Sequence, residues 1–289
     1  GYGMGKWVDL FTSRQTLSLI EIYNLISKFS KISQYNSNQF KDAVQVCLSL
    51  ALDRMADKNA SLTVWNTIGE KIEHVFGRQA LPMSWDFPEV NIFSYSTGNW
   101  ISHINLISEV IDYNSKNSEN GITERASALK LPLPDDSISC YFTDPPYYDS
   151  VPYSDLSDFF YVWLKRSVPE SLREEFRDEN TPKQEECIVD PIKGKDNKFL
   201  ENNMAIAMSE GRRILSPNGI GTVVFAHKST EGWEAQLLAM IAAGWIITAS
   251  WPIDTEQPGR LRAQNSAALA SSIHLVCRPR ENPDGSLRK

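Results

Sequence analysis

The sequence predicts an α/β protein with an N-terminal helical segment followed by a sheet. Apolar residues in the first hundred positions recur mostly at helical spacing. Further along, short apolar runs alternate with helical patterns, which is typical of βαβ units and a mainly parallel sheet. The polar run at 113–121 marks the change between the two patterns. We therefore predict a helical segment at 1–115, a catalytic sheet part at 116–281 and a tail at 282–289.

The helical segment begins with two predicted helices. Thr12 or Ser13 can cap the first helix because short hydroxyl side chains accept hydrogen bonds from the free N–H groups of a first turn. The apolar positions of this helix are Leu19, Ile22, Ile26 and Phe29. A second helix is predicted at 38–56, with one stripe formed by Phe40, Val44, Cys47, Leu48, Ala51 and Met55. Residues 80–100 are rich in aromatics, Pro and Gly, which predicts an ordered irregular segment.

Four short apolar runs in the second part are predicted strands, at 138–142, 221–227, 245–251 and 271–277. A helix is predicted at 197–215 and a turn at 216–219. Ser229 or Thr230 can cap a further helix that ends at Gly244. The linker before the last strand is too short and polar for a packed helix, so we expect that strand to be antiparallel.

Composition limits the classes of protein that the sequence allows. Hydrophobic residues make up 42% of the 289 positions and charged residues 22%, which is typical of soluble globular proteins. No apolar run approaches the roughly 18 residues that a membrane span needs. The four cysteines form no Cys-x-x-Cys pair, which argues against a zinc site and favours reduced thiols. We therefore expect a cytoplasmic protein without a metal or a membrane contact.

The formal net charge of −7 bears on nucleic-acid binding. Proteins that bind nucleic acid mainly through phosphates usually have a basic face. Any such contact in this chain is therefore expected to be local, or to be supplied by another domain.

The segment Asp144-Pro145-Pro146-Tyr147 follows the first predicted strand directly. Open α/β sheets bind ligands at the carboxyl ends of their strands. Prolines fix φ and lack an N–H group, so nearby carbonyls stay available to a ligand. Asp144 adds a second acceptor and Tyr147 an aromatic face. This combination fits a planar group with an –NH₂, such as adenine or cytosine, and holding both amine hydrogens would aim the nitrogen lone pair at an electrophile.

These four residues resemble motif IV of the amino-methyltransferases, which transfer a methyl group from S-adenosylmethionine to N6 of adenine or N4 of cytosine. Residues 143–166, 223–234 and 260–280 resemble the C-terminal half of a large family of adenine-specific DNA methylases that contain a zinc ribbon. Residues 11–15 and 78–91 are similar to the same family, so the resemblance covers most of the chain. It implies a Rossmann-like sheet of an S-adenosylmethionine-dependent methyltransferase.

The resemblance implies roles for several residues around the target base. Asp144 and the Pro145 carbonyl would accept hydrogen bonds from the amine. Tyr147 would stack on the base after its rotation out of the duplex, a step that such enzymes require. Tyr148 or Tyr153 would line the same pocket, although ordinary packing is an equal interpretation for these two rings.

Two further pairs of residues are weaker candidates. Residues 124–137 resemble the segment in which family members touch the adenine of the cofactor, so Ser127 and Ala128 are candidate cofactor contacts; a simple loop is the alternative. Arg260 and Arg262 lie in the polar loop before the last strand. They are candidates for phosphate or target-strand contacts, and a solvated loop is equally compatible.

One part of the expected pattern is missing. Family members have a glycine-rich loop after their first strand, whereas residues 1–5 (GYGMG) have no strand before them. Without that strand, the strand at 138–142 would have an unpaired edge. We therefore expect an incomplete sheet whose cofactor-binding half lies upstream or on a partner chain. Alternatively, residues 122–128 or the N-terminal helices cover the edge.

The sequence thus predicts an S-adenosylmethionine-dependent methyltransferase that flips adenine out of DNA and methylates N6. Similar enzymes serve restriction–modification systems. Two alternatives remain: an RNA N-methyltransferase, and a non-catalytic fragment that binds nucleic acid or protein.

Overall fold

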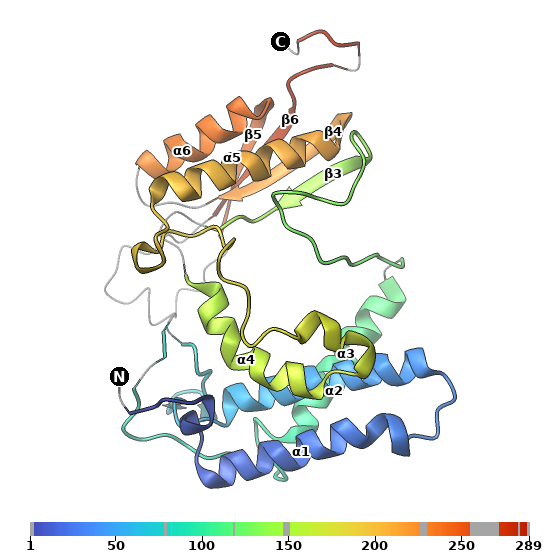
Figure 1. Ribbon diagram of the computed structural model, residues 1–289, viewed down its shortest axis with the longest axis vertical. Coiled ribbons are helices and arrows are strands. Elements are labelled where there is room, and N and C mark those ends of the chain that lie inside the picture. Colours follow the sequence, from blue (N-terminus) through green and yellow to red (C-terminus); the bar gives the residue numbers. More distant parts are fainter. Residues whose placement is uncertain are drawn as a thin grey trace. The chain divides into compact units, whose positions relative to one another are not determined.

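The computed structural model describes residues 3–77, 80–81, 83–117, 119–146, 151–225, 230–254, 272–282 and 284–287 (Figure 1). The chain forms two compact units. The first, the helical unit, combines Gly1–Gly121 with Tyr153–Gln184, and the second, the sheet unit, combines Ile122–Pro152 with Glu185–Lys289. Within the described ranges, no helix is both long and apolar enough to cross a membrane.

The elements of the helical unit are η1 (Trp7–Leu10), α1 (Ser13–Ile32), α2 (Asn38–Lys58), β1 (Trp65–Asn66), β2 (Lys71–Ile72), α3 (Trp100–Asn117), α4 (Tyr153–Ser167) and η2 (Glu170–Phe176). Both predicted helices are confirmed. Thr12 caps α1 in a reciprocal arrangement with Gln15: each side chain accepts a hydrogen bond from the other residue's backbone N–H, at 3.2 and 2.8 Å. The predicted boundary after residue 115 falls inside α3.

The core of the helical unit includes a cluster of aromatic rings. Phe159 of α4 is fully buried, and its ring centroid lies 5.7 Å from that of Phe11 and 5.5 Å from that of Phe76. Helix α4 packs against α1 and α2. Tyr153–Gln184 therefore belongs to the helical unit, although the sequence analysis assigned it to the second part.

Helix α2 buries polar as well as apolar side chains. Gln45, Ser49, Asp53 and Asp57 follow one another at four-residue spacing, and all four are buried. The predicted apolar stripe holds only in the second half of the helix, because Phe40 is exposed. Burial raises the pKa of Asp53 to about 9, so this carboxyl group is neutral at pH 7.

Two short stretches of the family resemblance meet in the helical unit. The Thr12 hydroxyl donates to Glu89 Oε1 at 2.6 Å, and Arg14 Nε donates to Glu89 Oε2 at 2.9 Å. The hydrogen bond from Thr12, followed by those from Arg14, lowers the pKa of Glu89. These contacts join the start of α1 to the irregular segment around Glu89, which gives both stretches a structural role.

The elements of the sheet unit are β3 (Ile138–Thr143), η3 (Pro191–Lys193), α5 (Asn197–Ile214), β4 (Leu215–Phe225), α6 (Thr230–Ala242), β5 (Trp245–Ile253) and β6 (Ser272–Pro279). The strand order is β3-β4-β6-β5. Strand β3 pairs with β4 in parallel, and β6 is antiparallel to both β4 and β5. The antiparallel last strand is thus confirmed, and the sheet as a whole is mixed. Strands β3, β4 and β5 do run in one direction, yet β6 lies between β4 and β5 and leaves a single parallel pair.

The predicted turn at 216–219 is also wrong, because these residues lie within β4. Ile138 of β3 lies opposite Leu215, whereas Cys140 lies opposite Ile220. Between these two pairs, β4 advances by five residues while β3 advances by two. The extra residues form an irregularity of the bulge type inside the strand, which explains why a turn-like sequence occurs there.

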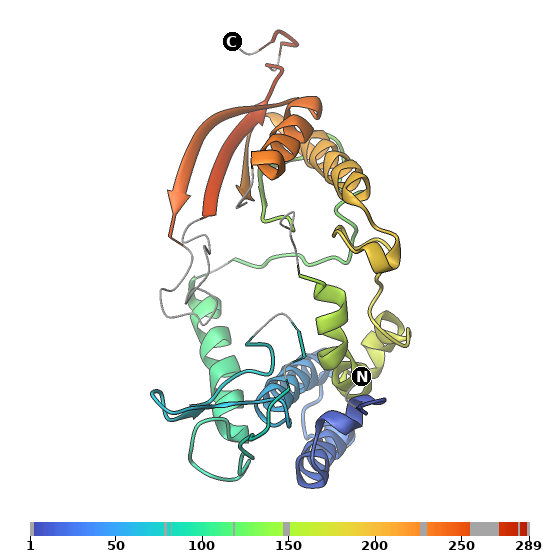
Figure 2. The same ribbon diagram turned by 90° about the vertical axis from the view of Figure 1, so that its left-hand side faces the viewer.

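Helices α5 and α6 lie side by side over one face of the sheet (Figures 1 and 2). Their apolar side chains form a core with the strands, in which Trp245 Nε1 donates to the Met208 carbonyl at 2.9 Å. A Cβ atom at Gly211 of α5 would lie 2.5 Å from the ring of Tyr141 on β3. Glycine at this position therefore allows the close approach of helix and strand.

The opposite face of the sheet exposes large apolar side chains. Phe142 of β3 is 63% exposed and Trp251 of β5 is 61% exposed. Within the described ranges, β3 pairs with β4 alone and is an edge strand. Residues 122–128 form no strand beside it; the only bridge there joins Ser127 to Lys130.

Candidate functional site

The candidate site begins where β3 ends. Asp144 is exposed, Pro145 is buried and Pro146 is half-buried. Proline has no N–H for a ladder and restricts the residue before it, so two prolines in succession end the pairing of β3 with β4 at Thr143. The exposed Asp144 carboxylate is accessible at the carboxyl end of the strand, as the sequence predicted.

The three residues Asp144, Pro145 and Pro146 at the end of β3 are called the Asp144 corner below. A small cavity lies beside this corner. Its lining consists of Pro146 after β3, Phe225 at the end of β4, Leu200, Glu201 and Met204 of α5, and Gly232, Ala235 and Gln236 of α6. The cavity volume is about 20 Å³. This is room for one water molecule and far too little for a purine. Among the described residues, the corner therefore presents an exposed carboxylate and a small recess rather than a finished pocket for a base.

Gln236 is the polar residue of this lining that lies deepest in the protein. Its side chain is only 3% exposed, and its Nε2 has no hydrogen-bond partner among the residues that the structure describes. A buried donor without a partner costs about 1–3 kcal/mol. Gln236 was not among the predicted site residues, although the sequence contains a signal: this polar residue interrupts the apolar stripe formed by Trp233, Leu237 and Met240.

Ser127 and Ala128 lie in a tight turn in the sheet unit. The Lys130 N–H donates to the Ser127 carbonyl at 3.0 Å, and the Leu129 N–H donates to the Ser127 hydroxyl at 3.2 Å. Both candidate residues are exposed, so they are accessible to a ligand. The same turn also fits the alternative stated above, a simple loop that makes no contact with a cofactor.

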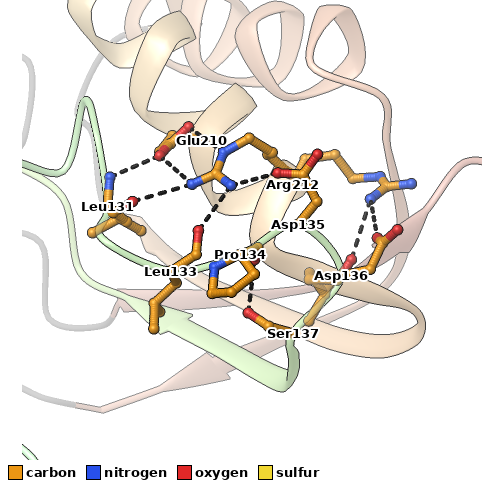
Figure 3. Close-up of polar contacts among 10 residues, drawn as sticks. Leu131, Leu133, Pro134, Asp135, Asp136, Ser137, Glu210 and Arg212 are labelled. Atoms are coloured by element: carbon orange, nitrogen blue, oxygen red, sulfur yellow. Dashed lines mark hydrogen bonds and ion pairs between the residues drawn. The ribbon is translucent and has the colours of Figure 1, made fainter.

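The segment after this turn is held on α5 by Arg213. Figure 3 shows its partners Glu210, Leu131, Leu133 and Asp135. The guanidinium group donates two hydrogen bonds to Glu210, at 2.9 and 2.7 Å. It also donates to the Leu131 and Leu133 carbonyls and to the Asp135 carboxylate, at 3.2, 2.9 and 2.5 Å. Glu210 in turn accepts from the Leu131 N–H at 2.7 Å. Hydrogen bonds from Arg213 and then from Leu131 lower the pKa of Glu210 to about 2. We call Arg213 and Glu210 the clamp.

We expect Arg213→Lys to loosen residues 131–135. A lysine is a single point charge and cannot replace a planar fork that donates to several groups at once. Hydrogen exchange at the Leu131 amide should become roughly tenfold faster as local opening becomes easier. Arg173→Lys is the matched control, because Arg173 makes one exposed ion pair with Glu170. Unchanged exchange at Leu131 would show that the clamp does not hold this segment.

The remaining predicted residues divide into two groups. Tyr153 begins α4 in the helical unit, and its side chain is half exposed. Tyr147, Tyr148, Arg260 and Arg262 lie outside the described residues. Among the described residues, no group of three or more His, Cys, Asp or Glu side chains could hold a metal ion.

Comparison with known proteins gives no family. No protein-family model matches the chain, and no curated protein matches it. A function for this chain therefore has to be inferred from its residues and their geometry.

Proposed function

We propose that this chain is the target-base half of an S-adenosylmethionine-dependent methyltransferase that acts on N6 of adenine in DNA. One observation supports this proposal above all. Asp144 presents an exposed carboxylate at the carboxyl end of β3, immediately before two prolines, in a strand that pairs in parallel with β4. Ligands of open α/β sheets bind at such strand ends.

The chemistry of this corner suits an amine. Asp144 accepts one amine hydrogen and the Pro145 carbonyl accepts the other. Both acceptors are fixed before the base arrives, because the strand and the two proline rings restrict the backbone. Fixed acceptors orient the amine and stabilise the positive charge that develops on its nitrogen during transfer.

The sheet unit also supports the view that the catalytic domain is incomplete. Parallel sheets are usually covered on both faces by helices, and the β3–β4 pair is the parallel part of this sheet. Here α5 and α6 cover one face, while the other exposes Phe142 and Trp251, and β3 has a free edge within the described ranges. We propose that this is a Rossmann-like methyltransferase sheet that lacks its glycine-loop strand, which an upstream segment or a partner chain supplies.

The residues present fit the cofactor only in part. Ser127 and Ala128 are accessible and have the place in the sequence that the family resemblance assigns to contacts with the cofactor adenine. The chain has no glycine-rich loop after a strand to receive the methionine end of the cofactor. Binding of S-adenosylmethionine is therefore expected to need the missing half.

The same free edge favours a second candidate function. A sheet without its cofactor strand can serve as a non-catalytic module that binds nucleic acid or protein. If the chain is catalytic, RNA remains an alternative substrate. The Asp144 corner is proposed to contact the amine of the base, whereas RNA and DNA differ in the sugar.

Titration of the chain with S-adenosylmethionine in a calorimeter, followed by transfer of a tritiated methyl group, tests the proposal. Transfer is measured to DNA and RNA oligonucleotides of the same sequence, with and without the upstream part of the reading frame. Transfer to adenine in DNA is the expected result. Preferential transfer to RNA would favour the RNA enzyme. No transfer to either, even with the upstream part, would favour the binding module.

A further inference from the structure

We infer that the loop at residues 91–99 of the helical unit is a contact site for unpaired bases of a DNA strand. Phe93 and Tyr95 stack on the bases, and Arg54 of α2 contacts the phosphates beside them. The inference rests on the proposed function, because rotating a target base out of a duplex leaves its partner base unpaired. The loop and Asp144 belong to different units of the chain.

The two aromatic side chains of this loop are turned out into solvent. Phe93 is 81% exposed and Tyr95 is fully exposed, whereas the adjacent Ile92 is buried and anchors the loop. An exposed aromatic ring offers a flat π face, and nucleobases stack on such faces with little dependence on which base is present. In a duplex the faces of each base are covered by the neighbouring base pairs. The two rings therefore fit an unpaired base better than a paired one.

Hydrogen bonds within the loop fix the backbone that carries both rings. The Trp100 N–H donates to the Ile92 carbonyl at 3.0 Å, which closes the loop at the start of α3. The Phe93 N–H donates to Asn91 Oδ1 at 3.1 Å, and the Ser94 N–H donates to the Asn91 carbonyl at 3.0 Å. Because this backbone is ordered before a ligand arrives, binding costs less conformational entropy than it would in a disordered segment.

The loop packs beside the C-terminal end of α2, where Arg54 and Lys58 lie. His103 of α3 donates from Nε2 to the Gly98 carbonyl of the loop at 3.2 Å. Burial, followed by the charge of Arg54, lowers the pKa of His103 to about 4, so Arg54 lies within electrostatic range of this ring. A Cβ atom at Gly98 would lie 3.9 Å from the Cβ atom of Lys58. Both cations are therefore neighbours of the loop.

The charges around the loop favour a phosphate backbone. Arg54 is exposed and has no hydrogen-bond or ion-pair partner among the residues that the structure describes. The carboxyl groups closest to it along α2 are both buried: Asp53 is neutral at pH 7, and Asp57 accepts from the Val75 N–H at 3.0 Å. Residues 91–99 contain no charged side chain. A guanidinium group beside a neutral aromatic loop thus supplies the local contact that nucleic-acid binding requires in a chain of net charge −7.

Two single-stranded DNA probes separate stacking from phosphate contact. One is a fluorescent oligonucleotide with ordinary bases, and the other has the same length but abasic sugars throughout, so it keeps the phosphates and lacks the bases. Anisotropy titration of the chain should show about tenfold tighter binding, or more, of the probe with bases. Phe93→Leu and Tyr95→Leu keep an apolar side chain without a π face. Each variant should bind the probe with bases about fivefold more weakly and the abasic probe like the wild type.

Arg54→Gln tests the phosphate contact. It should weaken binding of both probes by the same factor and reduce the slope of log affinity against log salt concentration by about 0.7, the value for one phosphate of a single strand. An unchanged slope would exclude Arg54 from the site. The matched controls are Tyr35→Leu and Lys31→Gln, at exposed positions before α2, whose first residue is roughly 24 Å along the helix from Arg54. Both should bind like the wild type, and far-ultraviolet circular dichroism checks that each variant is folded.

The outcomes distinguish this inference from the proposed function, which methyl transfer measures. If the wild type binds both probes equally well, or binds neither, the stacking site is ruled out. The same holds if Phe93→Leu and Tyr95→Leu bind like Tyr35→Leu, a result that would leave a protein partner as the ligand of the loop. If binding depends on both rings but no methyl group reaches DNA, even with the upstream part of the reading frame, the contact site stands and only the methyltransferase assignment fails.

Discussion

Asp144→Ala is expected to lower methyl transfer to adenine about 10²–10³-fold, the usual effect of removing one fixed charge-stabilising group from an active site. The affinity for S-adenosylmethionine should not change, because the proposed role of Asp144 is to accept a hydrogen bond from the amine. Asp144 is exposed, so its replacement should leave folding intact. Single-turnover transfer of a tritiated methyl group measures the rate, and calorimetry measures cofactor affinity.

Two further variants sharpen this test. Asp144→Asn keeps one acceptor oxygen but loses the charge, so its rate should lie between those of the wild type and Asp144→Ala. Asp112→Ala removes an exposed carboxylate from α3 and is the matched control for a change in net charge. Retained turnover in Asp144→Ala would refute the assignment of this residue as the amine acceptor.

Phe159→Ala is expected to destabilise the helical unit by about 3–5 kcal/mol, the range for truncating a buried phenylalanine. The ring of Phe159 is fully buried and contacts three aromatic rings, with centroid distances of 5.7 Å to Phe11, 5.5 Å to Phe76 and 5.1 Å to Phe160. Its removal leaves a cavity at the point where α4 packs against the rest of the unit, since surrounding side chains relax only in part.

Urea denaturation followed by circular dichroism at 222 nm measures this loss as a lower midpoint for the helical unit. Tyr95→Ala, which removes a fully exposed ring from the same unit, is the control and should change stability by less than about 0.5 kcal/mol. Equal midpoints for Phe159→Ala and Tyr95→Ala would contradict the packing of α4 in this core.

Local sequence signals predicted several elements well. Thr12 and Gln15 form the cap of α1 because both partners lie within four residues of each other. The end of β3 at Asp144 follows from the two prolines, whose effect on the backbone needs no distant partner. The antiparallel direction of β6 was also predictable, because the linker before it is too short and polar for a packed crossover helix.

Features that depend on distant partners were missed. The turn predicted at 216–219 is part of β4, because pairing with β3 holds these residues in the sheet as an irregularity. The polar run that marked a boundary is partly the end of α3. Arg213 looks like an ordinary charged residue at the end of a helix, and only the folded segment 131–135 shows that it forms a clamp.

By itself, the sequence determined the α/β class and the position of Asp144 at a strand end, because these depend on backbone restrictions and patterns within a few residues. The tertiary structure alone decided that β6 lies between β4 and β5, that α4 packs in the helical unit, and that Gln236 lines a cavity beside Pro146. These features depend on which apolar surfaces pack against each other although they lie far apart in the sequence. Short-range patterns are compatible with several such packing arrangements.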